Sequence, residues 1–279
     1  MSVGVIRYNK VTNGSRHLIN LEKAVLLKDD RVFKLASKYQ SRMGRSPITG
    51  HITAWHRGSG HKRLFREVNY KSTNRISMVM GVSYDPYRTS FVSTNFDIVN
   101  KQFFNSVSML NFSSGMLVKE NGNLKDSEMN KTLYHNNQQL LLGYRASLQR
   151  IPIGSVINSI SIRDKVTYTK SAGAKAQLIR VDEKSATVKL STGLLKKVPA
   201  KSTAIVGIVS NDKHRLVVYG KAGRKRNLSR RPIVRGIAMN PVDHPHGGRS
   251  NGGRPSVSPW GILTKGKFSL RKKRKKKHE

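Results

Sequence analysis

The sequence predicts an all-β protein with two small antiparallel barrels in the middle of the chain and extended basic arms at both ends. Three observations indicate this fold class. Short runs of β-branched and aromatic residues recur between turn-prone Gly, Asn, Asp and Pro. In the second half no helical run separates them, and both ends are rich in Lys and Arg. The 279 residues, 37% of them hydrophobic, suffice for one large or two small domains.

Residues 1–47 are expected to form an extended basic arm. Asn13-Gly14 and Met43-Gly44 are turn signals, and Ser46-Pro47 marks a break. A short helix over Lys28–Tyr39 fits the pattern, although its periodicity is weak. The first residues lack the apolar core of a signal peptide and the arginine content of a transit peptide, so we expect no cleaved leader.

Residues 48–110 are expected to form the first barrel. Short strands at this spacing are typical of small barrels, and oligonucleotide-binding Greek-key barrels are one such class. Trp55 falls in a strand pattern and is expected to be part of the core. The predicted strands are Ile48–Trp55, Leu64–Tyr70, Ile76–Val82 and Ser90–Ile98.

A basic loop, His56–Arg63, lies between the first two of these strands. Its two glycines would let the backbone approach a ligand closely, and several potential cations flank them. It is not a Walker loop, because no Gly-Lys-Ser/Thr follows at the required spacing. The loop is either a solvated hairpin tip or a phosphate-binding hairpin, and the charge of the chain favours the second interpretation.

Residues 111–150 are expected to be a divergent insertion or linker. The wider region 99–150 is rich in Asn and Ser, with strand segments expected around Phe103–Val118 and a turn at Asn121–Asn123.

Residues 151–219 are expected to form the second barrel. Tight connections at Asp182–Ser185 and Ser191–Gly193 separate short strands, which is typical of an antiparallel barrel. The predicted strands are Val156–Ile162, Gln177–Val181, Ala186–Leu190, Leu195–Val198, Ala204–Ser210 and Leu216–Tyr219.

Residues 220–279 are expected to form a basic tail centred on Gly236–Arg249. Pro241 and Pro245 remove backbone donors, and Gly247-Gly248 adds backbone freedom. The tail has too little apolar surface to offset its ordering entropy. We therefore expect it to be disordered alone and to take its shape from a polyanion.

Charge is the extreme feature of the composition. The chain has 53 Lys and Arg against 15 Asp and Glu, a formal net charge of +38. Clustered charge of one sign is the footprint of a nucleic-acid binder, whereas a solubilising surface would mix both signs. No apolar stretch is long enough to span a bilayer. The absence of cysteine excludes disulfides, cysteine-based zinc sites and thiol nucleophiles.

His244 and His246, beside Asp243, invite three interpretations. A zinc site needs at least three protein ligands, and no further candidate ligand is close in sequence. A general base would need a nucleophile motif, which is also missing. The preferred interpretation is that both imidazoles stack on bases or bind phosphate and ribose. For Trp260, stacking on a base and covering a barrel are both left open.

These motifs resemble the universal large-subunit ribosomal protein two family. The closing signature is Gly236–Gly248 (GIAMNPVDHPHGG), then Pro259-Trp260-Gly261 and Thr264–Lys267. Asp243 and the Pro-Trp-Gly ending resemble its bacterial and organellar branch. Further matches are Arg16-His17, Gly50–Thr53 with His56–Arg63, Tyr84-Asp85-Pro86 with Arg88, Ile151–Gly154, Ser171–Gly173 and Gly220–Gly223.

The resemblance implies an oligonucleotide-binding barrel, a Src-homology-three-like barrel and a tail that threads into large-subunit rRNA near the peptidyl-transferase centre. It implies support of subunit association and translation, with catalysis left to the RNA, no cofactor and no small-molecule substrate. Neighbouring ribosomal proteins are implied partners; small-subunit rRNA and bridging magnesium ions are left open. The residues expected to bind rRNA are His56, Arg57, Gly58, Gly60, His61, Lys62, Arg63, Lys221, Arg224, Lys225, Arg226, Arg230, Arg231, Arg235, Asn240, His244, His246, Arg249, Arg254, Trp260, Lys265 and Lys267.

The chain departs from the family pattern in three places. Asp164–Tyr168 replaces a glycine-rich turn, Arg249 stands where a further glycine is common, and 99–150 is barely alignable. The Asn-rich drift of that region suggests a mitochondrial ribosome, with a bacterial or plastid ribosome as the alternative. Two other functions are kept open: a free RNA-binding factor or chaperone, and a hydrolase that uses His244 with Asp243.

Overall fold

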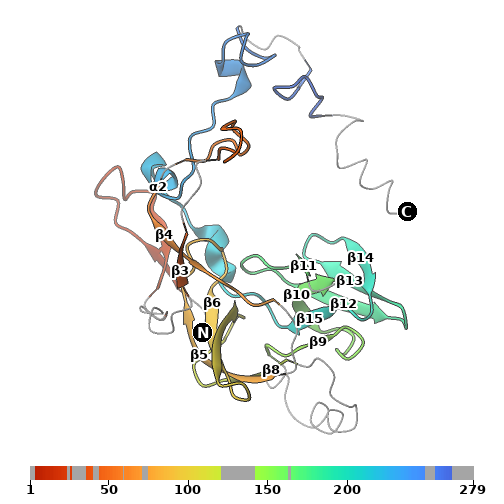
Figure 1. The fold of residues 1–279 in the computed structure, drawn as a ribbon. Helices are drawn as coiled ribbons and strands as arrows, with labels where there is room; N and C mark the ends of the chain where they lie inside the picture. The colour runs from red at the N-terminus through yellow and green to blue at the C-terminus, as the bar shows by residue number, and fades with distance from the viewer. Residues whose placement is uncertain are drawn as a thin grey trace. The chain divides into compact units, whose positions relative to one another are not determined.

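The computed structural model describes residues 4–23, 26, 36–39, 44–58, 60–70, 75–120, 142–162, 165–248 and 255–265. The chain forms two compact units. Unit 1 comprises residues 1–41 and 61–224, and unit 2 comprises residues 42–60 and 225–279. Strands dominate the described residues and helix is scarce (Figure 1), which confirms the all-β prediction. Among these residues, no helix is both long and apolar enough to cross a bilayer.

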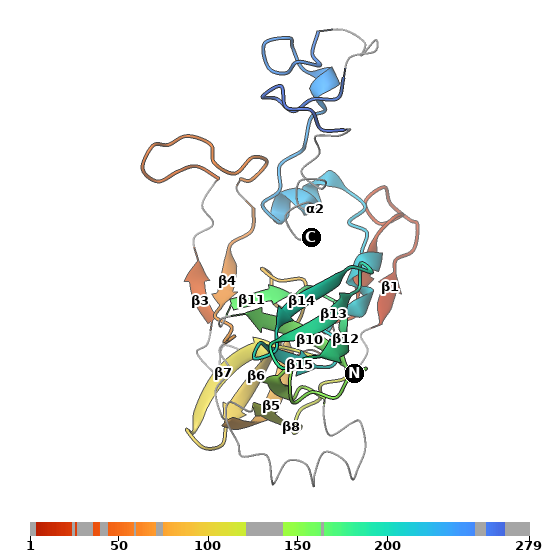
Figure 2. The same cartoon turned by 90° about the vertical axis from the view of Figure 1, so that its right-hand side faces the viewer.

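One continuous sheet forms the centre of unit 1. Its strands follow the order β14-β13-β12-β10-β15-β9-β8-β5-β6-β7, and β11 pairs with β10. Figure 2 shows the two groups of strands, β5 to β8 and β10 to β15, next to each other. The strands are β5 (Arg75–Ser83), β6 (Val92–Asp97), β7 (Gln102–Val107), β8 (Leu117–Glu120), β9 (Arg145–Ser147), β10 (Val156–Ile162), β11 (Lys165–Tyr168), β12 (Ala176–Val181), β13 (Ser185–Leu190), β14 (Leu195–Pro199) and β15 (Thr203–Val206).

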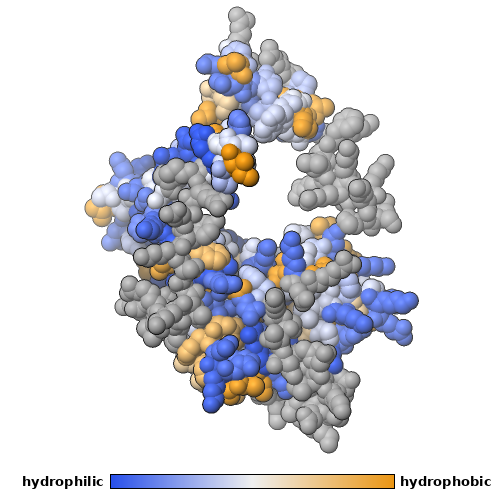
Figure 3. Space-filling view, in the orientation of Figure 1, coloured by the Kyte–Doolittle hydropathy of each residue, from blue (hydrophilic) through white to orange (hydrophobic). Residues whose placement is uncertain are grey.

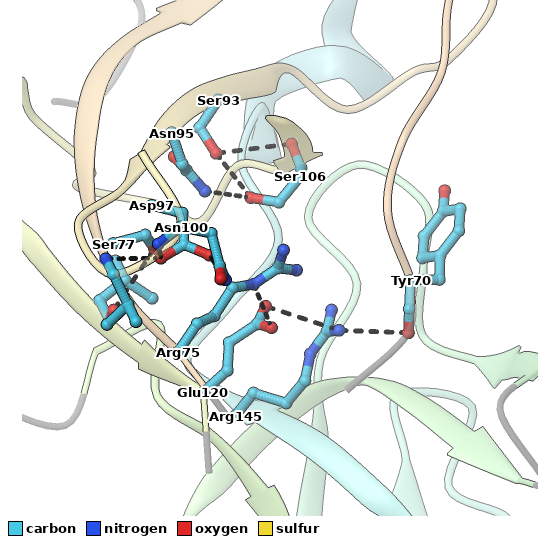
Figure 4. Close-up of polar contacts among 12 residues, drawn as sticks. Tyr70, Arg75, Ser77, Ser93, Asn95, Asp97, Asn100, Ser106, Glu120 and Arg145 are labelled. Atoms are coloured by element: carbon cyan, nitrogen blue, oxygen red, sulfur yellow. Dashed lines mark hydrogen bonds and ion pairs between the residues drawn. The ribbon is translucent and has the colours of Figure 1, made fainter. Parts of the chain in front are cut away.

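The first group, β5 to β8, fits the oligonucleotide-binding barrel. Every second residue of β5 is buried, as a strand with one face on a core requires. Antiparallel pairs join β5 to β6, β5 to β8 and β6 to β7. The apolar core includes Val79, Val92, Val107 and Phe112. Small polar side chains are buried beside it: the Asn95 amide donates to Ser106 Oγ at 2.8 Å (Figure 4).

The second group, β10 to β15, fits the Src-homology-three-like barrel. Hairpins connect β12 to β13 and β13 to β14 without a break in chain order. Leu148, Ile157, Ile160, Leu178 and Val188 are fully buried in one apolar cluster. Burial of each such side chain contributes about 1.5–3 kcal/mol, so this cluster is the main stabilising element of the group.

Short β9 joins the two groups. It pairs antiparallel with β15 on one side, and Arg145 pairs in parallel with Glu120 of β8 on the other. The side chains of the same two residues form part of a buried ion cluster (Figure 4). Glu120 Oε2 accepts a hydrogen bond from Arg75 Nε at 2.9 Å, and its Oε1 lies 3.6 Å from Arg145 Nη1. Arg145 Nη1 also donates to the Tyr70 carbonyl at 3.1 Å.

The pKa values in this cluster follow from burial and charge. Burial lowers the pKa of Arg145, the carboxylate of Glu120 opposes that shift, and the charge of Arg75 adds to it. Burial alone would raise the pKa of Asp97, but hydrogen bonds from Asn100 and Val99 and the charge of Arg75 lower it. The cluster therefore keeps its charges only because each one faces an opposite charge or a donor.

Two short antiparallel ribbons in unit 1 involve the N-terminal arm, and the second of them takes up β4 (Arg63–Arg66), which was predicted as the barrel strand Leu64–Tyr70. One pairs β1 (Val5–Arg7) with β2 (Ile19–Leu21), and Ile19 also bridges Val218. The other pairs β3 (Ala36–Tyr39) with β4. The prediction of a helix over Lys28–Tyr39 is therefore wrong at Ala36–Tyr39, which form a strand. Positions 28–35 lie outside the described residues.

Two predicted strands are absent, and five observed strands were not predicted. Ile48–Trp55 forms a turn closed by a bridge between Arg45 and Ile52, because its apolar residues have no core to pack on: Ile48 is 92% exposed. Leu216–Tyr219 begins at the end of a 3-10 helix, η3 (Asp212–Leu216). The strands that were not predicted are β1, β2, β3, β9 and β11, and with three or four residues each they are too short to show alternation.

Unit 2 is built almost without an apolar core. Among its described residues no hydrophobic side chain is buried, and Val242 is 91% exposed. Trp55, which was expected in the core, is exposed as well. The regular elements are the second half of a short helix that crosses the unit boundary, α2 (Ala222–Asn227), and a single 3-10 turn, η4 (Gly236–Ala238). Backbone hydrogen bonds rather than burial define its local shape.

Candidate nucleic-acid interface

Unit 2 concentrates positive charge. Over residues 42–60 and 225–279 the sequence has 19 Lys and Arg but only two acids, Asp243 and Glu279. Hydrophilic side chains cover most of the visible described surface, and hydrophobic groups are scattered over it (Figure 3). Cations at this density repel one another unless a polyanion neutralises them. The charge of unit 2 therefore makes it a candidate phosphate-binding surface.

The segment His56–Gly58 pairs with the start of the tail. Arg57 and Arg230 form an antiparallel bridge. The Arg231 N–H donates to the His56 carbonyl at 2.9 Å, and His56 Nδ1 lies 3.0 Å from the Pro232 carbonyl oxygen. The expected hairpin between two strands is thus replaced by a pairing with residues more than 170 positions away. This pairing brings His56, Arg57, Arg230 and Arg231 together.

Both glycines of the basic loop take part in this pairing, and Gly60 is required by it. The Gly58 N–H donates to the Ser229 carbonyl at 3.3 Å. Gly60 has φ +107°, and a Cβ there would lie 2.4 Å from Ser229 Oγ and 2.9 Å from the Asn227 carbonyl. The close approach that the glycines permit is therefore to the tail's own backbone, and not directly to a ligand as we expected.

The predicted contact residues with basic side chains divide into an exposed group and a group bound to other parts of the chain. Arg224 donates through Nη1 to the carbonyls of Gly14 and Tyr219, so it holds the N-terminal segment of unit 1. Arg63 donates to the Pro86 carbonyl at 3.2 Å and lies over the Tyr87 ring. The exposed members are His56, Arg57, His61, Lys62, Lys221, Lys225, Arg226, Arg230, Arg231, Arg235 and Lys265.

The stretch 236–248 forms a series of closed turns. The Asn240 carbonyl accepts from the Asp243 and His244 amides, and Gly248 N–H donates to the Met239 carbonyl at 3.1 Å. A Cβ on Gly247 would lie 2.3 Å from the Asn240 carbonyl oxygen. The glycine pair therefore permits tight packing here, instead of only adding the freedom that the sequence suggested.

The two histidines contact each other inside these turns. His244 is 8% exposed, and a Cβ on Gly236 would lie 2.6 Å from its ring. Its Nδ1 accepts the His246 backbone N–H at 3.0 Å, so a neutral His244 carries its proton on Nε2. His246 Nε2 lies 3.1 Å from both the Val257 N–H and the Pro255 carbonyl. Both rings therefore stabilise these turns through hydrogen bonds to the backbone of His246, Pro255 and Val257.

Two tryptophans meet in unit 2. The rings of Trp55 and Trp260 have centroids 6.4 Å apart and planes at 70°, an edge-to-face contact. Trp260 is 69% exposed, so most of its side chain is not covered by other residues of unit 2. Trp55 was not predicted to bind RNA. Its position beside His56 and Arg57 of the basic loop is the signal in the sequence that could have singled it out.

A second group of cations and aromatic rings lies on unit 1 and was not predicted either. The Lys23 ammonium lies 3.9 Å from the Tyr84 ring centroid, and Arg88 lies over Phe65. Burial lowers the pKa of Lys23 and raises that of Tyr84. Arg88 also pairs with the buried Asp85 at 2.6 Å. Because these cations are already paired with rings and carboxylates, this group holds the loop Tyr84–Arg88 against the N-terminal segment at Lys23 and against β4 at Phe65.

Three predicted contacts, Arg249, Arg254 and Lys267, lie outside the described residues. Within the part of the chain that the structure describes, no three His, Cys, Asp or Glu side chains gather as a metal site would require.

Comparisons with known proteins cover nearly the whole chain. The family model "Ribosomal Proteins L2, RNA binding N-terminal domain" matches residues 32–118, and "Ribosomal Proteins L2, C-terminal domain" matches 142–261. "Large ribosomal subunit protein uL2m" of Reclinomonas americana is 38% identical over 277 residues, which cover 96% of this chain and 94% of the relative. "Large ribosomal subunit protein uL2" of Orientia tsutsugamushi is 37% identical, covering 95% and 94%. The relative of the same name in Ehrlichia chaffeensis is 37% identical, covering 95% and 93%.

Proposed function

This chain belongs to the L2 family of large-subunit ribosomal proteins, whose members are structural components of the ribosome and not enzymes, and from that premise we propose how it binds rRNA. The exposed cations of unit 2 neutralise phosphates of large-subunit rRNA near the peptidyl-transferase centre. Unit 2 takes its stable shape there, and unit 1 docks by shape and phosphate contacts. In this position the protein supports subunit association and translation.

One observation carries the proposal: unit 2 has many charges of one sign and no buried hydrophobic side chain among its described residues. Hydrogen-bonded turns without apolar burial cannot offset the entropy of ordering the chain. Phosphate contacts would supply both the missing stabilisation and the counter-charge. Folding on binding is the behaviour expected of such a segment.

The residues divide their roles by position. Arg57, Arg230 and Arg231 would contact adjacent phosphates, because the backbone pairing holds them together. His244 would act mainly as a positioning residue, since its ring is buried in the turn. We also propose that these roles follow the division into arm, first barrel, insertion, second barrel and tail, with boundaries at 47/48, 110/111, 150/151 and 219/220. Magnesium ions that bridge the protein to rRNA are compatible with these roles.

The test is the salt dependence of binding to a fragment of large-subunit rRNA. About 6–10 phosphate contacts lose roughly 10³–10⁵ in affinity between 50 and 200 mM salt. The triple variant Arg57→Gln, Arg230→Gln, Arg231→Gln should reduce the slope of log affinity against log salt by about 3. A matched triple variant on unit 1, Lys184→Gln, Lys196→Gln, Lys197→Gln, controls for net charge. Equal slopes for the two variants would refute the assignment to unit 2.

Sedimentation distinguishes a ribosomal constituent from a free RNA-binding factor. The proposal expects the tagged protein to co-migrate with large subunits in a high-magnesium gradient. Recovery only in the light fractions, with RNA bound, would favour the free factor. The same gradient from purified mitochondria tests the compartment, for which the relative named uL2m and the Asn-rich region 99–150 support a mitochondrial ribosome.

A further inference from the structure

The contact between Trp55 and Trp260 is unusual for two side chains of this kind. Tryptophan has the largest apolar surface of any side chain and is normally well buried. Here the Trp55 and Trp260 side chains are 59% and 69% exposed, although the rings contact each other edge to face with their centroids 6.4 Å apart. The contact thus covers only part of each ring and leaves aromatic surface open to solvent.

Each ring is held by a defined backbone turn. Trp260 lies in the turn Ser258–Gly261, where the Gly261 N–H donates to the Ser258 carbonyl at 2.9 Å and Gly261 has φ +74°. The flanking residues Val257 and Leu263 form a bridge. Trp55 precedes His56, which has φ +57° and is hydrogen-bonded to the tail. The two rings are therefore presented from two closed turns.

A purely structural role accounts poorly for this arrangement. A pair of rings that served as a local core would be buried by neighbouring apolar side chains, and no hydrophobic side chain among the described residues of unit 2 is buried. A cation follows each ring in the sequence: Arg57 comes two residues after Trp55, and Lys265 comes five residues after Trp260. Exposed aromatic faces among cations are the features with which proteins bind unpaired nucleotides.

We propose that Trp55 and Trp260 form a stacking site for one unpaired nucleobase of the bound RNA. Because the planes cross at 70°, a base can lie parallel to only one of the two rings. The second ring then meets the base edge-on and limits its position. The neighbouring cations bind the phosphates on either side, and stacking requires no particular base, because every base has a π-face.

This inference deepens the proposed function, and one experiment separates the two. The chain has only two tryptophans, so its indole fluorescence reports on this site alone. The full-length protein is titrated with an oligoadenylate of about 12 nucleotides and with an abasic oligonucleotide of the same length and charge. We expect the oligoadenylate to quench the fluorescence and to bind roughly 10- to 100-fold more tightly than the abasic strand.

Variants assign the difference to the rings. Trp260→Leu and Trp55→Leu keep apolar bulk but remove the wide π-face, and each should bring the oligoadenylate affinity close to that of the abasic strand. Tyrosine circular dichroism checks that unit 1 remains folded. Neither substitution changes a residue of unit 1, because unit 1 contains no tryptophan. Ile262→Ala is the matched control, because this residue is 66% exposed two positions from Trp260.

Each result decides something. Equal, salt-sensitive affinity for both strands would overturn the stacking site and leave the phosphate-binding function intact. Failure to bind either strand would count against both. A preference for oligoadenylate that survives both leucine variants would place base recognition elsewhere on the chain and overturn the inference.

Discussion

Replacing Glu120 by Gln should strongly destabilise unit 1. The side chains of Arg75, Glu120 and Arg145 are 8%, 6% and 4% exposed, so water screens their charges very little. Gln keeps the shape of Glu but carries no charge, and it leaves two buried guanidinium groups without their shared counter-charge (Figure 4). Removing one partner of a buried ion pair typically costs about 3–5 kcal/mol.

The effect can be measured by urea unfolding followed through tyrosine circular dichroism. A loss of about 3–5 kcal/mol in a domain of this size lowers the melting temperature by roughly 6–20 °C. The midpoint urea concentration should fall while the m-value is unchanged, because the same surface becomes exposed on unfolding.

The matched control is Asp182→Asn. Arg180 Nε and Asp182 Oδ1 form an ion pair at 2.7 Å, but these side chains are 74% and 42% exposed. Losing this pair should cost no more than about 1 kcal/mol. Adding Arg75→Met to Glu120→Gln should recover part of the lost stability, because one unpaired buried charge is removed. The reasoning is refuted if Glu120→Gln and Asp182→Asn unfold at the same urea concentration.

Three further changes test other parts of the structure. Leu178→Ala should destabilise unit 1 by about 2–5 kcal/mol because it opens a cavity, whereas Ile179→Ala, 41% exposed on the other face of β12, should change it by about 0.5 kcal/mol; equal urea midpoints would contradict the register of β12. Gly60→Ala should weaken rRNA binding through its clash with Ser229, beyond the effect of Gly50→Ala, a position where φ is also positive but a Cβ would meet open space; matching affinities at one salt concentration would argue against the loop–tail pairing. Burial lowers the pKa of His214, so its neutral form is favoured in the folded state, and stability should be full above the unfolded pKa of about 6.5 and fall as the pH drops below it. His214→Gln should lose this part of the pH dependence, and a thermal-melt profile that does not change with the substitution would refute it.

Strands that bury alternate residues could be predicted from the sequence. The bounds of β10 match the prediction, and those of β5, β6, β12 and β13 differ by one or two residues. In β5, β12 and β13 one face packs on a core, which leaves a pattern of period two in the chain, whereas β6 and β10 bury consecutive residues and were predicted from their composition and the turn signals that flank them. Residues 48–55 have a similar composition but no core beside them, so composition alone led to a wrong strand there.

The candidate site was predictable in its chemistry but not in its geometry. Charge and motifs pointed to the cations of unit 2, because clustered charge is visible in a sequence. The bridge between Arg57 and Arg230 is not, since no local pattern encodes a pairing across such a distance. The same holds for Trp55 and Trp260, whose contact depends on that pairing of loop and tail.

The parallel pair of Glu120 and Arg145 has a consequence for how this family can vary. It joins the last residue of β8 to the first residue of β9, so the chain between them leaves and returns one strand spacing apart. Closing a longer connection across that spacing costs only about 0.6 kcal/mol for each doubling of its length. Evolution can therefore lengthen, shorten or rewrite this connection in one lineage after another while both barrels stay as they are.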